Sequence, residues 1–447
     1  MFHVKTLRTL ALTATAVSVL ALAACTPGSL GSTDPTTSGS GKPGAAAVEI
    51  TVLVDNAEQS VKTAQAIIDG FNASQSDVKA VMETRPQGTD GDNIVKTRLA
   101  TGEMTDVFVY NSGSLMAALD PQKNLVPITD EPYMDVLDES FKTAVSSGDD
   151  IFGAPVGQAM AGGVLYNKKV YADLGLEVPK TWDAFMANNA KIKEAGIDPV
   201  IQTYGETWTS QLLVLADFHN VTAVDGEWAA KFTANKAKFA DEPAIKGFQR
   251  LQDVHDAGYL NKDFASAKLT QGMQALVDGK GAHYPMLTFA ISAYVELADD
   301  AAENIGFFAQ PGDTEDIYGL TAWTPGGAYI PTTTTGEKLD AAKKFLAYIA
   351  TTEACDAQSA AMAPTGPYMV KGCTLPDGLP TAVNDLQGYF DEGNVSPALE
   401  FVSPVKGPNL EKITVEVGSG IATAADGAAR YDEDVKKQAQ QLGLEGW

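Results

Sequence analysis

Trp208 lies in a short polar stretch without helical or strand periodicity, Tyr204-Gly205-Glu206-Thr207-Trp208-Thr209-Ser210. Its indole ring therefore has no obvious apolar face of a helix or strand to join. A flat apolar ring among hydrogen-bonding groups suits a ligand with both apolar and polar surface, because each buried polar group left unpaired costs about 1 to 3 kcal/mol. Trp208, Tyr204 and Glu206 are therefore candidates for non-covalent ligand contacts.

Motifs for covalent chemistry are absent from the sequence. It contains no Gly-x-Ser-x-Gly, no His-Glu-x-x-His and no Gly-rich phosphate loop followed by Lys-Ser/Thr. Glycoside hydrolysis needs two carboxylates at a defined separation, but among 57 Asp and Glu residues no pair stands out. After the first 24 residues the only histidines are His219, His255 and His283, which supply acid-base or zinc chemistry poorly. We predict no catalytic residue, no metal site and no cofactor.

Strand and helix signals alternate from Val48 onward, which is typical of an α/β fold. Strands are expected over 50–54, 78–82 and 106–110, and an amphipathic helix with apolar residues from Val61 to Phe71 follows the first of them. In open α/β sheets, ligands bind beyond the carboxyl ends of the strands. The polar side chains after these strands are therefore candidate hydrogen-bond partners: Asn56, Glu58, Gln59, Asn111 and Ser112, with Arg85 and Gln87 as further candidates.

The segment 152–185, FGAPVGQAMAGGVLYNKKVYADLGLEVPKTWDAF, carries the most specific pattern in the chain. A brief strand is expected over 164–166, a short helix should stop at Gly175, and Thr181 should cap the next helix. The segment resembles the crossover of family 1 extracellular solute-binding proteins, the receptors of sugar ABC importers. The matching residues are Pro155, Tyr166, Asn167, Lys168, Leu174, Gly175, Pro179, Thr181 and Trp182.

Weaker parts of the same resemblance extend over most of the chain after Val48. The runs 326–331 and 336–346 match well, whereas 276–283 matches only in part, because Leu276 replaces an aromatic residue and His283 a methionine. The resemblance implies a two-lobed α/β fold of the type II periplasmic-binding-protein class, with a ligand cleft between the lobes. Three crossings are expected, near 155–163, near Gln310 and after the helix of Phe345. Lobe 1 would then comprise 48–157 plus 311–350, and lobe 2 would comprise 158–310 plus 351–447.

The resemblance also adds candidate ligand contacts and a function. Members of the family commonly place a ligand-touching aromatic near a Gly-Gly turn, which here implicates Trp323 with Gly326 and Gly327. The chain would capture a carbohydrate, such as a di- or oligosaccharide, and deliver it to a membrane permease of an ABC importer, acting as a monomer. The remaining candidate contacts are Gln158, beside the first crossing, and Phe289.

The first 47 residues carry export signals. A basic start, an apolar run over 9–20 and the sequence Leu22-Ala23-Ala24-Cys25 resemble a bacterial lipoprotein signal, which implies cleavage after residue 24 and a lipid on Cys25. Residues 25–47 are rich in Gly, Ser, Thr and Pro and are expected to be a flexible linker at the outer face of the cell membrane. The net charge of −25 argues against nucleic acid as a partner.

Two further cysteines, Cys355 and Cys373, lie in the exported part of the chain. An oxidising surrounding favours a disulfide between them, and two reduced thiols are the alternative. The ligand also has alternatives. A polyamine, an amino-acid derivative or a peptide could occupy the cleft, since Asp55, Glu58 and Glu206 would suit a cation. A surface-anchored glycosidase is the rival from another class.

Overall fold

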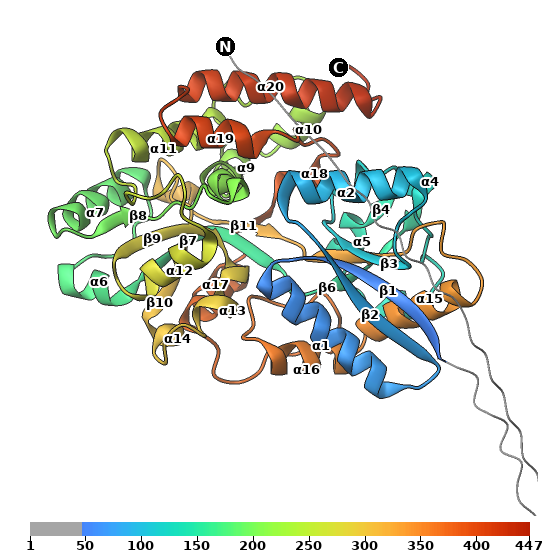
Figure 1. The fold of residues 1–447 in the computed structure, drawn as a ribbon. Helices are drawn as coiled ribbons and strands as arrows, with labels where there is room; N and C mark the ends of the chain where they lie inside the picture. The colour runs from blue at the N-terminus through green and yellow to red at the C-terminus, as the bar shows by residue number, and fades with distance from the viewer. Residues whose placement is uncertain (1–46) are drawn as a thin grey trace, which may run out of the picture. The chain divides into compact units, whose positions relative to one another are not determined.

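Two separate β-sheets organise residues 47–447, the part of the chain that the computed structural model describes (Figure 1). We call the sheet β2-β1-β3-β12-β6 with its helices lobe 1, and the sheet β13-β11-β7-β9-β8, in which β10 also pairs with β7, lobe 2. The expected two-lobed α/β fold is confirmed. No helix in the described range is both long enough and apolar enough to cross a bilayer. The predicted signal peptide 1–24, Cys25 and the linker as far as residue 46 lie outside the described residues.

Lobe 1 is built on β1, which pairs in parallel with β2 on one side and with β3 on the other. Helix α1 buries Ala64, Ile67 and Phe71 against this sheet, and the ring of Phe71 lies 5.2 Å from that of Phe345 in α15. The strands of lobe 1 are β1 (Val48–Asp55), β2 (Val78–Arg85), β3 (Val107–Tyr110), β4 (Ser146–Ser147), β5 (Asp150–Ile151), β6 (Gly153–Val156) and β12 (Gly326–Tyr329). Its helices are α1 (Glu58–Ser74), α2 (Gly88–Thr101), α3 (Ser114–Ala117), α4 (Pro121–Asn124), η1 (Pro132–Val136), α5 (Glu139–Ala144), α15 (Glu337–Ile349) and α16 (Thr352–Ala361).

Lobe 2 is built on β7, which pairs with β9 along one edge and with β11 and then β10 along the other. The caps predicted from sequence are confirmed, since α6 ends at Gly175 in the left-handed conformation and the Thr181 hydroxyl accepts a hydrogen bond from the N–H of Ala184 at the start of α7. The strands of lobe 2 are β7 (Met160–Asn167), β8 (Asp198–Val200), β9 (Gly281–Leu287), β10 (Ile305–Ala309), β11 (Leu320–Trp323) and β13 (Val395–Pro397).

The helices of lobe 2 cover both faces of its sheet, and the hydrophobic clusters of the described residues each lie within one lobe. Trp228 stacks on Phe232 with ring centroids 4.9 Å apart, which anchors the helices after β8. The helices are α6 (Lys168–Leu174), α7 (Trp182–Glu194), η2 (Thr207–Gln211), α8 (Leu212–Leu215), α9 (Phe218–Val224), α10 (Trp228–Thr233), α11 (Ile245–Asp256), α12 (Leu269–Val277), η3 (Thr288–Ala290), α13 (Ile291–Tyr294), α14 (Ala301–Asn304), η4 (Glu315–Ile317), α17 (Thr381–Glu392), α18 (Leu399–Val402), α19 (Leu410–Gly418) and α20 (Ala424–Gln441).

The chain crosses between the lobes three times, but two of the crossings differ from the sequence prediction. The first, between β6 and β7, lies where expected. The second lies between β11 and β12, not near Gln310, because the chain adds β11 to the lobe 2 sheet before it leaves. The third follows Cys373, not the helix of Phe345, because α16 packs on α1 and Val370 and Cys373 join the lobe 1 core, whereas Leu375 packs in lobe 2. Lobe 1 is therefore 48–156 plus 326–373, and lobe 2 is 160–323 plus 375–447.

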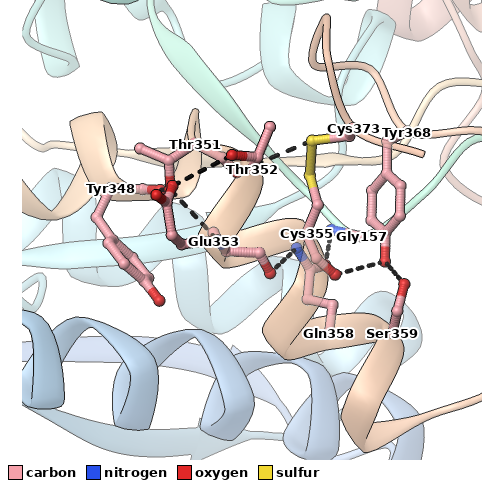
Figure 2. The surroundings of a disulfide bond; sticks show 11 residues. Gly157, Tyr348, Thr351, Thr352, Glu353, Cys355, Gln358, Ser359, Tyr368 and Cys373 are labelled. Atoms are coloured by element: carbon pink, nitrogen blue, oxygen red, sulfur yellow. Dashed lines mark hydrogen bonds between the residues drawn. A yellow bond between two sulfur atoms is a disulfide. The ribbon is translucent and has the colours of Figure 1, made fainter. Parts of the chain in front are cut away.

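A disulfide joins Cys355 of α16 to Cys373, as the sequence favoured (Figure 2). The Tyr368 hydroxyl donates to the carbonyl of Cys355 at 3.0 Å and lies 2.7 Å from the Ser359 hydroxyl. One helical turn from the disulfide, Gln358 accepts a hydrogen bond from the N–H of Gly157 at 3.1 Å. The loop after α16 is thus held to its own helix, and that helix is held to the first crossing.

Candidate ligand-binding site

A cavity of about 430 Å³ lies between the two lobes. Its walls come from the carboxyl ends of β1, β2 and β3 and the segment 358–365 in lobe 1, from η2, α8, β9, β11 and the segment 400–411 in lobe 2, and from the first two crossings. This volume is within the range of small-molecule sites, about 300 to 1,000 Å³. Of the residues predicted from sequence, the cavity brings together Gln59, Asn111, Ser112, Gln158, Trp208, Phe289, Trp323 and Gly326.

The lobe 1 wall is polar because the sheet ends there. Parallel strands place their carboxyl ends at one edge, and the helices that follow begin at the same edge with side chains that have not yet joined a core. Gln59, Ser60 and Thr63 come from the first turns of α1, and Asn111 follows β3. These side chains supply the amide and hydroxyl groups that a hydrogen-bonding ligand needs.

Arg85 and Asp92 add charge to the lobe 1 wall. The Arg85 side chain, at the end of β2, is almost fully buried, lies over the ring of Tyr110 at 5.5 Å and donates to the carbonyl of Pro86 at 3.0 Å. Burial raises the pKa of the Asp92 carboxyl, and the positive charges of Arg85 and Lys96 oppose that rise. Arg85 was a further candidate from the sequence.

Besides the charged side chains of the segment 400–411, the lobe 2 wall has an apolar and aromatic part. Trp208 and Phe289 lie with their ring centroids 5.7 Å apart at an angle of 44°, and Leu212, Leu215 and Leu287 continue the same surface. The Nε1–H of Trp208 is buried and has no hydrogen-bond partner within residues 47–447. Aromatic and aliphatic side chains of this kind can cover the CH faces of sugar rings.

Trp323 is held in one orientation by charged neighbours. Its Nε1–H donates to Glu400 Oε1 at 3.1 Å, and the other oxygen of Glu400 accepts from Lys406 Nζ at 2.7 Å. Glu400 and Lys406 are themselves largely buried and both line the cavity. Trp323 is only 6% exposed, so it offers the cavity little surface.

Two of the predicted polar residues use their side chains to join a crossing to a loop of lobe 1. The Ser112 hydroxyl donates to the carbonyl of Pro325 at 2.8 Å, in the second crossing. Gln158 Oε1 accepts from both the N–H and the hydroxyl of Thr365, at 2.6 and 3.0 Å, and so joins the first crossing to the loop after α16. The side chains of Ser112 and Gln158 therefore stabilise the cavity walls through hydrogen bonds within the protein.

Three lobe 1 candidates do not line the cavity. Asn56 is exposed, and Glu58 is exposed and pairs with Lys62 one helical turn away at 3.3 Å. Gly327 lies within the sheet, where an added Cβ would come within 2.5 Å of the Tyr329 ring, so that this glycine makes room for Tyr329. We withdraw these three residues as ligand contacts.

Two lobe 2 candidates, Tyr204 and Glu206, also face away from the cavity. Tyr204 is 4% exposed and packs edge-on against Phe264, and burial raises the pKa of its hydroxyl. Glu206 accepts a hydrogen bond from the N–H of Leu269 at 2.6 Å and thus satisfies the start of α12. Both residues are structural, and Trp208 is the part of this stretch that reaches the cavity.

Several cavity residues were missed from the sequence. Thr89, Asp92 and Lys96 lie on α2, which begins at Gly88, whereas the candidates taken from the end of the second strand stopped at Gln87. The segment 400–411 had no signal, because it approaches the cavity from the end of the chain, after the short strand β13.

The cavity can bind a small molecule, and the described residues form no metal site. No three His, Cys, Asp or Glu side chains within 47–447 lie close enough together to hold an ion. A cavity with walls from two sheets, joined by three crossings, defines a two-lobed binding protein that can enclose its ligand.

Comparison with known proteins identifies the family. The chain belongs to the bacterial extracellular solute-binding proteins, whose family model matches residues 56–354. The multiple sugar-binding protein of Streptococcus mutans is 24% identical over 301 residues, which cover 65% of this chain and 69% of that protein. A chitin-oligosaccharide-binding protein has a similar structure, with a TM-score of 0.77 and 19% identity over 89% of this chain and all of the other. RafE, solved in complex with raffinose, has a TM-score of 0.70 and 19% identity over 88% of this chain and 99% of the other.

Proposed function

We propose that this chain is the substrate-binding protein of an ABC importer and that it captures an oligosaccharide between its two lobes. The observation that carries this proposal is that one cavity holds two kinds of surface, an aromatic and aliphatic patch around Trp208 and Phe289 in lobe 2 and a wall of amides, hydroxyls and charged groups in lobe 1. A sugar chain has both kinds of surface, since its rings have apolar faces and its hydroxyl groups require hydrogen bonds when they leave water.

The family supports the proposed class of activity. Solute-binding proteins bind and release their ligand, and no bond needs to be made or broken. The named relatives bind multiple sugars, chitin oligosaccharides and raffinose according to their own descriptions. These relatives favour a carbohydrate over the polyamine, amino-acid derivative or peptide that the sequence left open.

Delivery would follow from closure of the two lobes. A ligand that contacts both walls binds the closed form more tightly than the open form, and it shifts the population by that difference in affinity. The closed form would present the surfaces of both lobes together to the membrane permease. The lipid on Cys25 and the linker that follows would keep the protein near that permease, at the outer face of the membrane.

Thermal unfolding with a panel of ligands tests the proposal. Mono-, di- and oligosaccharides are compared with polyamines, amino acids and peptides, and each sugar is recovered and checked for cleavage. A ligand at 100 times its dissociation constant stabilises the folded state by about 2.7 kcal/mol, which raises the Tm by about 3 °C for a folded part of this size. A shift by one class of sugar, recovered intact, is the expected result.

Two other outcomes would overturn the proposal. A shift produced only by polyamines, amino acids or peptides would leave the two-lobed binding protein but replace its ligand. Cleavage of the sugar would favour the glycosidase, and the carboxylates of the cavity would then be the groups to substitute.

A further inference from the structure

Glu411 crosses the gap between the lobes. It belongs to lobe 2, in the first turn of α19, yet its Oε1 accepts a hydrogen bond from the hydroxyl of Thr89 in lobe 1 at 2.6 Å. The Glu411 residue is only 8% exposed. A hydrogen bond between a hydroxyl and a carboxylate is stronger than one between neutral groups, and burial removes the competition from water.

The position of Thr89 makes this contact more than a pairwise one. Thr89 lies in the first turn of α2, whose N-cap residue, Gln87, makes no capping hydrogen bond with its side chain. The Glu411 carboxylate also lies beside Gly88, since a Cβ built there would be 3.5 Å from Oε2. A carboxylate at the start of a helix is favourable because the first N–H groups are unsatisfied and the helix dipole is positive there.

One carboxylate thus lies at the start of two helices, its own α19 and the facing α2. Opening of the lobes would leave Glu411 on α19 and remove it from α2. We propose that Glu411 is a closure latch, which binds Thr89 at the start of α2 of lobe 1 only when the lobes are closed and thereby sets the balance between the open and closed forms. The proposal concerns the movement of the lobes and is independent of which ligand the cavity takes.

A second contact between the lobes provides a matched comparison. Lys62 of α1 donates to Glu296, after α13, at 2.6 Å, but the two side chains are 37% and 47% exposed. Exposed ion pairs contribute little because water and salt screen them. In Figure 1 α1 and α13 lie in the lower half of the view, and α2 and α19 lie in the upper half, so the two contacts are at different places along the lobe boundary.

Paramagnetic relaxation enhancement can measure the latch without any ligand. A spin label attached to a Thr97→Cys variant, at an exposed position of α2 outside the cavity lining, broadens amide signals of α19 and α20 whenever the lobes close. The effect falls with the inverse sixth power of distance, so even a minor closed population is visible. The proteins compared are the wild type, Thr89→Val, Glu411→Gln, the double variant, Thr89→Ser and Lys62→Met.

The latch predicts a specific pattern among these variants. Thr89→Val and Glu411→Gln should each lower the closed-to-open ratio about tenfold, which is the value of one charge-assisted hydrogen bond. The double variant should be no worse than the more severe single variant, since both remove the same contact. Thr89→Ser should restore closure because it keeps the hydroxyl, and Lys62→Met should change the ratio less than twofold.

Other results would overturn the latch. Effects of Thr89→Val and Glu411→Gln that simply add would show that the two side chains act separately. A Glu411→Gln variant that closes normally but binds ligand weakly would make Glu411 a ligand contact instead. Because these ratios are measured in ligand-free protein, they remain informative even if no sugar binds.

Discussion

The two walls of the cavity are built in different ways. The lobe 1 wall consists of strand ends and helix starts, which are polar because the backbone there requires hydrogen-bonding partners. The apolar part of the lobe 2 wall comes from η2, α8, the end of β9 and η3, which bring Trp208, Phe289 and several leucines to the surface of the cavity. Lobe 1 thus supplies hydrogen-bonding groups from strand ends and helix starts, and lobe 2 supplies an apolar contact area.

The lobes also differ in covalent bracing, since both cysteines of the disulfide belong to lobe 1. The disulfide closes a loop between residues 18 apart in sequence, which corresponds to about 3 kcal/mol of stabilisation in the chain-entropy model. The double variant Cys355→Ala/Cys373→Ser should lose roughly this amount, and lobe 1 should lose it first. Hydrogen exchange in mild urea should show earlier opening of β1 and α1 than of β7 and β9.

Reduction of the wild-type protein serves as the control for that variant and should give the same exchange pattern. Equal loss of protection in both lobes would show that the lobes unfold as one unit. The disulfide would then stabilise lobe 2 as much as lobe 1.

Substitution of one residue from each wall compares their roles in binding. Trp208→Ala should weaken the affinity for the sugar about 30-fold, which corresponds to about 2 kcal/mol for a buried aromatic contact. Gln59→Ala should weaken it about fivefold, since one neutral hydrogen bond contributes about 1 kcal/mol. Isothermal titration calorimetry measures both. Trp447→Ala removes a tryptophan that packs on Phe232 outside the cavity lining, and it should leave the affinity unchanged.

The reverse order, with Gln59→Ala more harmful than Trp208→Ala, would show that the polar wall dominates binding. It would also remove the argument for stacking on the lobe 2 wall.

The smallest predicted effect concerns the charge of the lobe 1 wall. Burial raises the pKa of Asp92 in the folded protein. The protonated form of Asp92 therefore favours folding most below the unfolded pKa, about 3.9, and this contribution to the free energy of unfolding is lost as the pH rises through the folded pKa. Asp92→Asn should therefore raise the Tm of the ligand-free protein at pH 7, and this gain should disappear near pH 3.5. Asp69→Asn, at an exposed position on α1, is the control for the loss of one negative charge. A gain for Asp92→Asn that is the same at both pH values would exclude this cause.

The same contrast between the walls explains how much the sequence could predict. Gln59 and Asn111 were found because strand ends have a sequence signal, and the edge at which they meet follows from the parallel sheet. In the stretch 204–210 the residue types alone could not separate Trp208 from Glu206. Glu206 turned out to satisfy the start of α12, a partner more than sixty residues away in sequence.

The boundaries between lobes were predictable only where the pattern was local. The first crossing has its own motif, but the second was placed too early because Pro311 and Gly312 follow closely after β10 and the sequence did not indicate that β11 would still join lobe 2. Glu400, Lys406 and Glu411 reach the cavity only through the packing of lobe 2, so no local pattern could have placed them there.

The position of β12 has a consequence for the order in which the protein can be completed. In the lobe 1 sheet β12 lies between β3 and β6, although it follows β6 by about 170 residues in the chain. Until residues 326–329 have emerged, β6 has no neighbour and β3 has an open edge. A nascent chain therefore carries an unfinished sheet while most of lobe 2 is being made, and it depends on protection from aggregation until its last third is available.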